Sequence, residues 1–508
     1  MNTKKISNLI SKFLIIFLII QPIFDLKIFY NSISTLIRVI LIFMFFIYYF
    51  FTTKNKKKYY LLIYPLLIGI YFVLHHINAL KFTSLVPGNF NYSIFKELLY
   101  FIKMLTPFLL IYSLYKANFS INTIMYIMKS LVLIIGLVIV VSNFFMFSYG
   151  NYSDTLIKAN FFDWFNNNSP YTYQDLASKG LFEYGNQISA ILIMFLPFMI
   201  YGLLQKKSFT NGFILCLNIL SLILLCTKVS VLGILVVVIF TIFACLFISF
   251  IHKKHFTVKN YIPIGIVLVA YFLLLPINPM FNRIQERATI AQNYNSQNAE
   301  IVESINNTTS NIEEIEEIIT DTPILENITV DESLQDSEKI EYIEANYQEK
   351  KLNKQFILEN YPYKYDLEFW YNFLQNDIWV TTDYRFIELS MIQRVVQINN
   401  NKMDMWFGIT NTRLQNIFNI EKDFVVQYYA LGIIGTIFVF APYFILLGIF
   451  AYKTIRNKFK NLKETNLLSS ITIIFLFAIS FFTGNLLNSL SFTIYFCLCF
   501  FIMLYNEK

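Results

Sequence analysis

The chain has little charge and few of the side chains that carry metal or redox chemistry. Only 14% of its 508 residues are charged, and it contains 5 cysteines and 4 histidines. All the cysteines lie in apolar stretches, so neither a disulfide framework nor a zinc cluster is indicated. A solvated or interfacial role is expected for His75 and His76 near the end of an apolar run, and for His252 and His255 in a basic segment. We therefore expect no metal site and no cofactor, and the lack of a P-loop argues against ATP-driven transport.

Hydrophobic residues dominate the rest of the composition. They make up 56% of the chain, aromatic residues make up 18%, and the mean hydropathy is positive. Apolar runs near the ~20 residues that a helix needs to cross the hydrocarbon of a bilayer recur from one end to the other. Because every backbone amide in hydrocarbon must be paired within its own segment, such runs should be helices. The expected fold class is an all-α polytopic membrane protein.

About twelve transmembrane helices are expected, with one large polar loop after the ninth. The expected spans are 9–25, 34–52, 59–76, 94–115, 123–146, 184–204, 212–227, 230–251, 261–278, 424–452, 466–484 and 488–505. Only Lys228 and its neighbours separate the seventh span from the eighth, and an odd total would invert the orientation of everything that follows. The resulting domains are 1–278 for nine helices, 279–360 for a loop with an acidic insertion, 361–423 for the folded part of that loop, and 424–508 for three helices.

Basic residues in the short loops set the expected orientation. Lysine and arginine in short loops are retained on the cytoplasmic side of a membrane. Four segments are strongly basic, namely Lys54–Lys58, Lys206–Lys207, His252–His255 and Lys453–Lys463. Twelve spans place all four inside together with both termini, and the first span lacks the small-residue cleavage pattern of a signal peptide. The long loop from 279 to 423 is then expected on the outer side.

This long loop has two unlike parts. Residues 300–349 hold fifteen of the 33 acidic residues of the chain against one lysine, Lys339. Low-complexity acidic sequence of this kind is usually mobile or marginally helical, and a tolerated surface insertion is the plainest interpretation. The part from Tyr361 to Asp423 is rich in tyrosine, tryptophan and asparagine, and a helix is expected from Arg385 to about Ile398. The second part is therefore the candidate functional domain.

Ionisable residues placed in or beside the apolar runs are the most informative feature. They are Arg38, Lys96, Glu97, Lys103, Lys228, Arg283 and Arg287, several of them toward the expected outer side. A charge within a span is expensive and suggests function by default, although snorkelling or ion pairing would explain any single one equally well. Several cations together favour an anionic ligand at the outer leaflet. A lipid-linked diphosphate presents its charge at that depth, and arginine can bind phosphate oxygens with two parallel hydrogen bonds.

Six short segments, taken in their order and spacing, resemble a known family. They are Gly180–Ala190 with its Gly185-Asn186 pair, Leu225-Cys226-Thr227-Lys228, Pro279–Arg283, Phe407-Gly408-Ile409, Ile420–Phe424 and Leu431–Gly435. Together they resemble the span openings, turns and loop exit of the bacterial O-antigen ligase and polymerase superfamily, particularly its members of Gram-positive type. The resemblance is spread over the whole chain.

The resemblance implies glycan assembly at the outer face of the bacterial cytoplasmic membrane, by a multi-pass protein. Enzymes of this family transfer a glycan from a polyprenyl diphosphate carrier to a hydroxyl, without a metal or a nucleotide sugar. The implied partners are a polyprenyl diphosphate-linked oligosaccharide and membrane lipids, with other polysaccharide-assembly proteins as further candidates and no nucleic acid. Because the diphosphate is already a good leaving group, the protein must mainly neutralise it, orient the acceptor and take one proton.

The resemblance also ranks the cations. The candidates for the diphosphate are, in order, Arg283 and Arg287, then Lys228 and Arg38, then Arg385 and Arg394. The first two match the position where the family places an arginine. The last two are loop residues that would close over the donor.

The proton acceptor is harder to assign. Ligases of the family use a histidine in the large outer loop, and residues 279–423 contain none, which favours a polymerase or a diverged relative. The candidate carboxylates are Glu388, Glu421 and Asp423. Glu421 and Asp423 precede an apolar run, however, where acidic residues commonly cap a helix, and capping is the preferred interpretation of both.

Aromatic residues crowd the second part of the loop and suit a sugar substrate. They are Tyr361, Tyr363, Tyr365, Phe369, Trp370, Tyr371, Trp379 and Tyr384. An aromatic belt at the membrane interface explains the same residues, and it is the default for Trp406. The rival function is a secondary transporter or a flippase of lipid-linked oligosaccharide. Such folds often contain internal repeats, and none is evident in this sequence.

Overall fold

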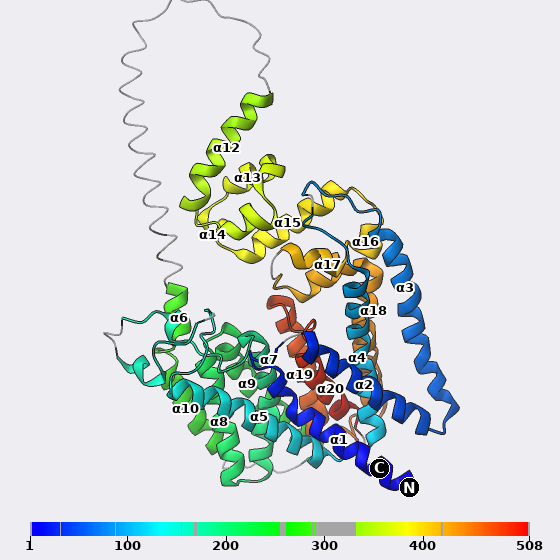
Figure 1. Ribbon diagram of the computed structural model, residues 1–508. Helices are drawn as coiled ribbons and strands as arrows, with labels where there is room; N and C mark the ends of the chain where they lie inside the picture. The colour runs from blue at the N-terminus through cyan, green and yellow to red at the C-terminus, as the bar shows by residue number, and fades with distance from the viewer. Residues whose placement is uncertain are drawn as a thin grey trace, which may run out of the picture.

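The chain is mostly helical in the computed structural model (Figure 1). The structure describes residues 3–505 apart from 31, 87, 154, 167–169, 254–260, 286–288, 290–291, 293–331 and 418–419. Within these residues, β pairing is confined to isolated bridges such as the one between Leu26 and Phe182. The all-α class expected from the sequence is confirmed.

Apolar helices form the membrane part, and each of the twelve predicted spans overlaps one of them. They are α1 (Thr3–Phe24), α2 (Ser32–Thr52), α3 (Ile63–Ala79), α4 (Ile94–Ala117), α5 (Ile121–Phe144), α7 (Gly185–Gln205), α8 (Phe209–Leu225), α9 (Lys228–Ile251), α10 (Ile262–Leu274), α18 (Asp423–Arg456), α19 (Glu464–Phe482) and α20 (Leu490–Leu504). In the described part of the chain, nine helices are long and apolar enough to cross a membrane, and there are ten if α10 and the segment Pro279–Gln285, bent by 41°, count as one span. The remaining two, α8 and α20, are shorter apolar helices of 17 and 15 residues.

The turn between α8 and α9 shows why the seventh and eighth spans are separate. Cys226 ends α8 in the left-handed conformation with a φ of 52°. Thr227 then caps α9, because its Oγ1 accepts a hydrogen bond from the backbone N–H of Ser230 (2.9 Å). A capped start satisfies one of the unpaired amides at the beginning of a helix. The predicted division of this apolar stretch is confirmed.

A helical loop domain lies between α10 and α18, on one face of the bundle that we call the loop face (Figure 1). Its described helices are α12 (Glu332–Glu349), α13 (Leu367–Leu374), α14 (Ile378–Thr381), α15 (Tyr384–Asn399), α16 (Asp404–Phe407) and α17 (Asn411–Leu414). The helix predicted from Arg385 to about Ile398 is α15. α12 falls within the acidic segment that was expected to be mobile or marginally helical, and it packs against the loop domain, since Tyr342 contacts Tyr371 of α13 edge-on and Ile343 is buried. The acidic residues between 300 and 331 lie outside the described part.

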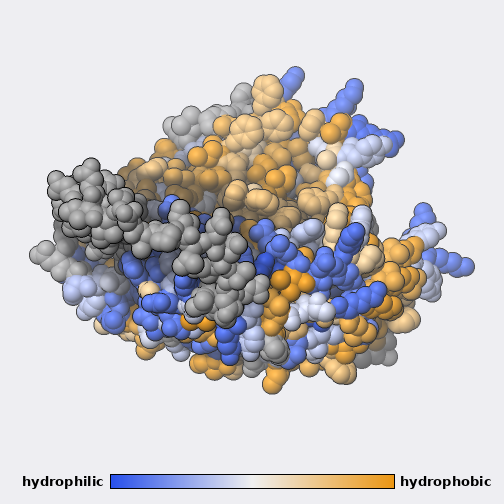
Figure 2. Space-filling view, turned by 90° about the horizontal axis from the view of Figure 1, so that it is seen from above, coloured by the Kyte–Doolittle hydropathy of each residue, from blue (hydrophilic) through white to orange (hydrophobic). Residues whose placement is uncertain are grey.

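The buried side chains divide into two clusters. The larger one joins α1, α2, the later part of α4, α5, α7, α8, α9, α10, the middle of α18, α19 and α20. The second joins the loop domain to α3, to the first part of α4 and to the first part of α18. Figure 2, which views the molecule from above, shows hydrophilic side chains gathered in a band across this face with apolar side chains on either side. Both termini lie away from the loop domain (Figure 1), and which face is outside the cell stays a prediction.

Candidate functional site

The loop between α5 and α7 folds over the ends of α8 and α9 on the loop face. Asn151 donates a hydrogen bond from Nδ2 to the carbonyl of Leu225 (2.6 Å), and the hydroxyl of Tyr152 donates to the carbonyl of Cys226 (2.9 Å). The last carbonyls of a helix have no partner within that helix, and these side chains supply one. The turn that leads into Lys228 is thereby held in place.

Tyr152 also brings Arg283 to this turn. The guanidinium carbon of Arg283 lies 4.2 Å from the ring centre of Tyr152 and 5.8 Å from that of Tyr173. Such a cation–π contact orients the flat guanidinium without neutralising it. Lys228, the first residue of α9, is exposed. Neither cation pairs with a carboxylate among the described residues, which leaves both able to meet an anionic ligand. Arg287 lies outside the described residues.

Arg38 has a different environment, inside the bundle. Its Nη2 lies 2.6 Å from Oδ1 of Asp25, and its Nη1 donates to the hydroxyl of Ser491 (2.6 Å). Both members of the ion pair are buried. Asp25 therefore already neutralises much of the positive charge of Arg38, which was predicted to bind the diphosphate. The sequence reasoning did not single out Asp25, which directly follows α1.

Arg394 forms an ion pair inside the loop domain. It binds Asp366 through two hydrogen bonds, from Nε (2.7 Å) and from Nη2 (2.8 Å). The hydroxyl of Tyr361 and the amide of Phe369 also donate to this carboxylate. Although burial alone would raise it, the pKa of Asp366 is held below its usual value by Arg394 and these other donors. Arg394 therefore joins α15 to α13.

Arg385 links the loop domain to the membrane helices. It donates to Oε2 of Glu421 from Nη2 (2.7 Å) and Nε (3.2 Å), and to the carbonyl of Phe482 at the end of α19 (3.2 Å). Arg385 and Glu421 are both partly exposed. Of the predicted third-rank cations, Arg385 is therefore the one that can reach a ligand on the loop face.

Asp423 does not cap α18. Its Oδ2 accepts the backbone N–H groups of Leu486 (3.0 Å) and Leu487 (2.9 Å), which belong to the turn between α19 and α20. The N-cap position of α18 is Lys422, and no side-chain hydrogen bond caps the helix there. The preferred interpretation of Glu421 and Asp423 as helix caps is therefore wrong. Asp423 instead fixes a turn some sixty residues further along the chain.

Glu388 is buried beside Glu421, the carboxylate that pairs with Arg385. It is 2% exposed, and it accepts a hydrogen bond from the backbone N–H of Glu421. Burial, helped by the negative charge of Glu421, raises the pKa of Glu388 to about 8. At neutral pH this side chain is mostly protonated.

The raised pKa of Glu388 gives a test by pH. A carboxyl whose pKa is higher in the folded than in the unfolded state contributes stability that is fully present below about pH 4.5 and lost as the pH rises to about 8. The melting temperature of the purified protein should therefore fall between pH 5 and pH 8, and Glu388→Gln should remove part of this slope. Parallel melting curves for the two proteins over that range would contradict the assignment.

His75 anchors the segment between α16 and α17 to the membrane helices. Its Nδ1 donates to the carbonyl of Phe407 (2.6 Å), and its Nε2 lies 3.1 Å from Oε1 of Glu97. Glu97 also accepts the backbone N–H groups of Asn411 and Thr412 (both 3.0 Å). His75 is fully buried, so the solvated or interfacial role expected for it is wrong. One feature of the sequence does indicate a buried role for His75. Glu97 lies in the next apolar run, and a carboxylate within a membrane span needs a polar or charged partner.

The aromatic residues of the loop differ in burial: Tyr361 and Trp370 are buried, Tyr363, Phe369 and Tyr371 are partly buried, and Tyr365 is exposed. Trp370 is fully buried and donates from Nε1 to the carbonyl of Tyr361, which is buried as well (2.7 Å). Neither ring can receive a sugar. Trp379 and Tyr384 are exposed.

These features define a multi-pass membrane protein with a helical loop domain and, on the same face, a cationic corner formed by Arg283 and Lys228. The family described as O-antigen ligase like membrane protein matches residues 7–506 of the chain. The chain belongs to this family, as the sequence motifs indicated. Comparison with curated proteins finds no match. Membership supports a cell-surface polysaccharide ligase or polymerase, a glycosyltransferase-like enzyme with a lipid-linked polysaccharide substrate in the membrane.

Proposed function

We propose that the chain is a cell-surface polysaccharide polymerase that works at the outer face of the bacterial cytoplasmic membrane. The acceptor hydroxyl attacks the anomeric carbon of a glycan carried on polyprenyl diphosphate. The bond between that carbon and the diphosphate oxygen breaks as the new glycosidic bond forms, and the diphosphate leaves with the bonding electrons. The hydroxyl proton passes to a carboxylate. The protein holds the diphosphate, aligns the two glycans and accepts the proton.

The observation that carries this proposal is the cationic corner formed by Arg283 and Lys228. The guanidinium of Arg283 rests on the ring of Tyr152, and Lys228 starts the neighbouring helix. A diphosphate gains charge on its leaving oxygen during the reaction, and fixed cations stabilise that charge most at the transition state. Arg287 follows on the same segment and stays a candidate for the same role. No metal is needed in this scheme.

Glu421 is the best of the three candidate carboxylates for the proton. Asp423 and Glu388 are buried, whereas Glu421 is partly exposed and lies beside Arg385, a second cation for the departing diphosphate. Glu388 would then act as a positioning residue, because it holds the backbone amide of Glu421.

A polymerase is preferred over a ligase because the loop supplies no histidine. The ligases of the family use a loop histidine, and residues 279–423 contain none. His75 lies under the loop domain, but both of its ring nitrogens are occupied, by Phe407 and Glu97. It is therefore a poor proton acceptor for a substrate.

A flippase for lipid-linked oligosaccharide is the second candidate, and one observation favours it. α18 is interrupted at Gly432, where the backbone is non-helical with a φ of 62°. Broken helices of this kind mark the substrate sites of many transporters. Here, however, the segment from Trp406 to Thr410 is packed against the break.

Deletion of the gene separates these functions. A polymerase mutant should accumulate single lipid-linked repeat units on the outer leaflet and lose long surface polymer. Repeat units trapped on the inner leaflet would overturn the proposal in favour of a flippase. Full-length polymer left on its carrier would overturn it in favour of a ligase.

A further inference from the structure

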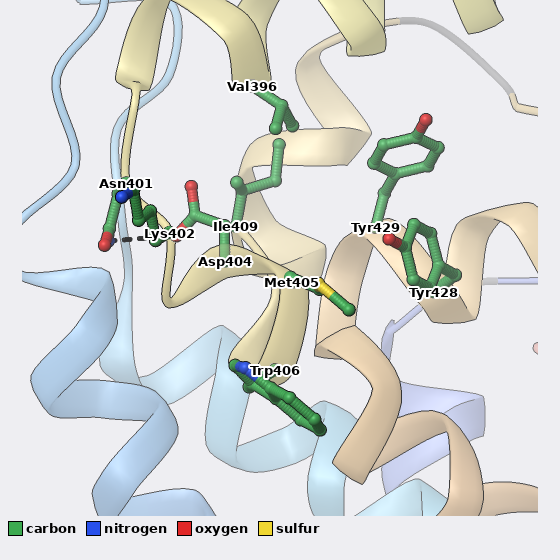
Figure 3. Close-up of a pocket in the computed structure, with 9 residues that line it drawn as sticks. All are labelled: Val396, Asn401, Lys402, Asp404, Met405, Trp406, Ile409, Tyr428 and Tyr429. Carbon is green, nitrogen blue, oxygen red and sulfur yellow. Dashed lines mark hydrogen bonds between the residues drawn. The ribbon is translucent and has the colours of Figure 1, made fainter.

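A cavity of about 420 Å³ opens beside the break in α18 (Figure 3). Its side chains include Lys402, Asp404, Met405 and Trp406 from around α16, and Tyr428 and Tyr429 from α18. None of them belongs to the cationic corner or to the group around Glu421. The volume is in the range of small-ligand pockets, and it suits one or two sugar rings.

The two backbone segments that line this cavity approach each other closely at two glycines with a positive φ, Gly408 and Gly432. A Cβ on Gly408 would lie 2.2 Å from the carbonyl oxygen of Ala430, and a Cβ on Gly432 would lie 2.3 Å from the carbonyl carbon of Trp406. The amide of Ile409 donates to the carbonyl of Tyr429 (2.8 Å), one of the carbonyls next to the break. Irregular backbone at this depth is tolerated where protein satisfies it. The backbone that carries the aromatic residues on both sides of the cavity is therefore held in a fixed arrangement.

The base of the cavity is an ordered polar group. Asp404 is buried, and its Oδ1 accepts hydrogen bonds from Asn78 (2.9 Å) and Asn401 (3.1 Å). Asn399 donates to the other oxygen, Oδ2. Burial raises the pKa of Asp404 above its ordinary value, while the amides of Asn78 and Asn399 oppose that rise. A carboxylate bound in this way is preorganised to accept one more hydrogen bond from a ligand hydroxyl.

The rim combines aromatic faces with unused polar atoms. Trp406 is 45% exposed and Tyr428 is 40% exposed, and Met405 beside them is exposed as well. Within the described residues, no hydrogen-bond partner is present for Nζ of Lys402, Nε1 of Trp406 or Oη of Tyr428. Flat apolar faces beside scattered donors and acceptors match the C–H face and the hydroxyl edge of a pyranose ring.

We propose that this cavity binds an uncharged sugar of the acceptor glycan, an inference that rests on the proposed polymerase function. The charges of Lys402 and Asp404 offset each other, so the cavity lacks the excess of cations that a diphosphate needs. The cations proposed for the diphosphate, namely Arg283, Lys228 and Arg385, do not line this cavity. A transferase must hold its acceptor glycan in a fixed orientation so that one hydroxyl reaches the donor, and a neutral aromatic cavity can hold a sugar of that glycan.

Binding of oligosaccharides tests the proposal without requiring turnover. The probe is the set of short oligosaccharides released by mild acid from the surface polysaccharide of the source strain. The full-length protein is kept in an amphipol, because maltoside detergents carry sugar head groups. Trp406→Ala and Tyr428→Ala should each weaken binding by about tenfold, the loss that corresponds to one stacked ring. Phe386→Ala is the matched control, since Phe386 is an aromatic residue of the loop domain with a similar exposed fraction (43%) and lies outside this cavity.

Saturation-transfer NMR on the oligosaccharide and melting curves of each variant provide the readouts. Unchanged melting temperature with lost binding in Trp406→Ala and Tyr428→Ala supports the proposal. Wild-type binding in both variants overturns it and leaves these rings as an interfacial aromatic belt. Failure of the wild-type protein to bind the oligosaccharides, or binding of polyprenyl phosphate in their place, also overturns it.

The kinetics distinguish failure of this inference from failure of the polymerase function. In a polymerisation assay, both cavity variants should raise KM for the acceptor and leave KM for the lipid-linked donor unchanged. Polymerisation with an unchanged acceptor KM would overturn the cavity assignment alone. Oligosaccharide binding that depends on Trp406 in a protein with no transferase activity would overturn the polymerase function and leave a glycan site.

Discussion

Replacement of Arg283 by alanine is expected to lower kcat/KM for the lipid-linked donor by about two orders of magnitude, the usual cost of removing one fixed group that stabilises developing charge. The structure explains this size, because the guanidinium lies on Tyr152 at the turn that starts α9, and no carboxylate among the described residues competes for it. Arg283→Lys should recover only part of the activity, since lysine keeps the charge but loses the planar pair of donors.

The controls for this prediction lie elsewhere in the same chain. Arg456→Ala removes an exposed arginine from the last turn of α18, at the opposite end of that helix from the loop domain, and should behave as wild type. Tyr152→Leu removes the ring under Arg283 without removing a charge, and should give an intermediate loss. Wild-type donor kinetics in Arg283→Ala would contradict the assignment of the diphosphate to this corner.

Glu421→Gln is expected to lower kcat by about a hundredfold or more while leaving KM for the donor nearly unchanged. Loss of a general base costs on the order of 10²–10⁴ in rate, and an amide of the same shape cannot take the proton. Glu368→Gln is the matched control, because Glu368 is an exposed carboxylate of the same domain whose nearest cation, Lys339, lies 3.8 Å away.

The pH dependence of the reaction tells which carboxylate takes the proton. If Glu421→Gln keeps its activity, and if the rate of the wild type rises with the ionisation of a group of pKa about 8, the base is Glu388. The sign follows from general base catalysis, in which only the ionised carboxylate can accept the proton, so the rate increases through that pKa.

The helices were predictable because their cause is local. An apolar run of the right length must form a helix in hydrocarbon whatever surrounds it. The separation of α8 and α9 was also visible, in the polar residues Thr227 and Lys228. The helix α15 followed from the pattern of the loop in the same way.

The contacts of the charged residues were not predictable because their partners are distant in sequence. Arg38 meets Ser491, and His75 meets Phe407, more than 300 residues away in each case. Hydropathy does not say which sides of two helices face each other. Asp423 was interpreted as a cap because the start of α18 follows it directly, whereas its hydrogen bonds go to Leu486 and Leu487.

The burial of the aromatic residues of the loop was likewise not predictable from the sequence. The tryptophans at 370 and 379 belong to one aromatic stretch of the sequence, yet the first is buried in the core and the second is exposed. The expectation from the sequence for Trp406 was an aromatic belt at the membrane interface. The position of Trp406 in a cavity depends on Gly408 and Gly432, whose backbones meet only in the folded protein.

Reconstitution tests the central claim most directly. The purified full-length protein is placed in liposomes with polyprenyl diphosphate-linked repeat units as the only glycan, and the products are separated by length. The account predicts a ladder of lipid-linked oligomers that grows with time in the wild-type protein and is strongly reduced by Arg283→Ala but not by Arg456→Ala. Repeat units that stay single, under conditions in which the protein remains folded and binds the donor, would contradict it.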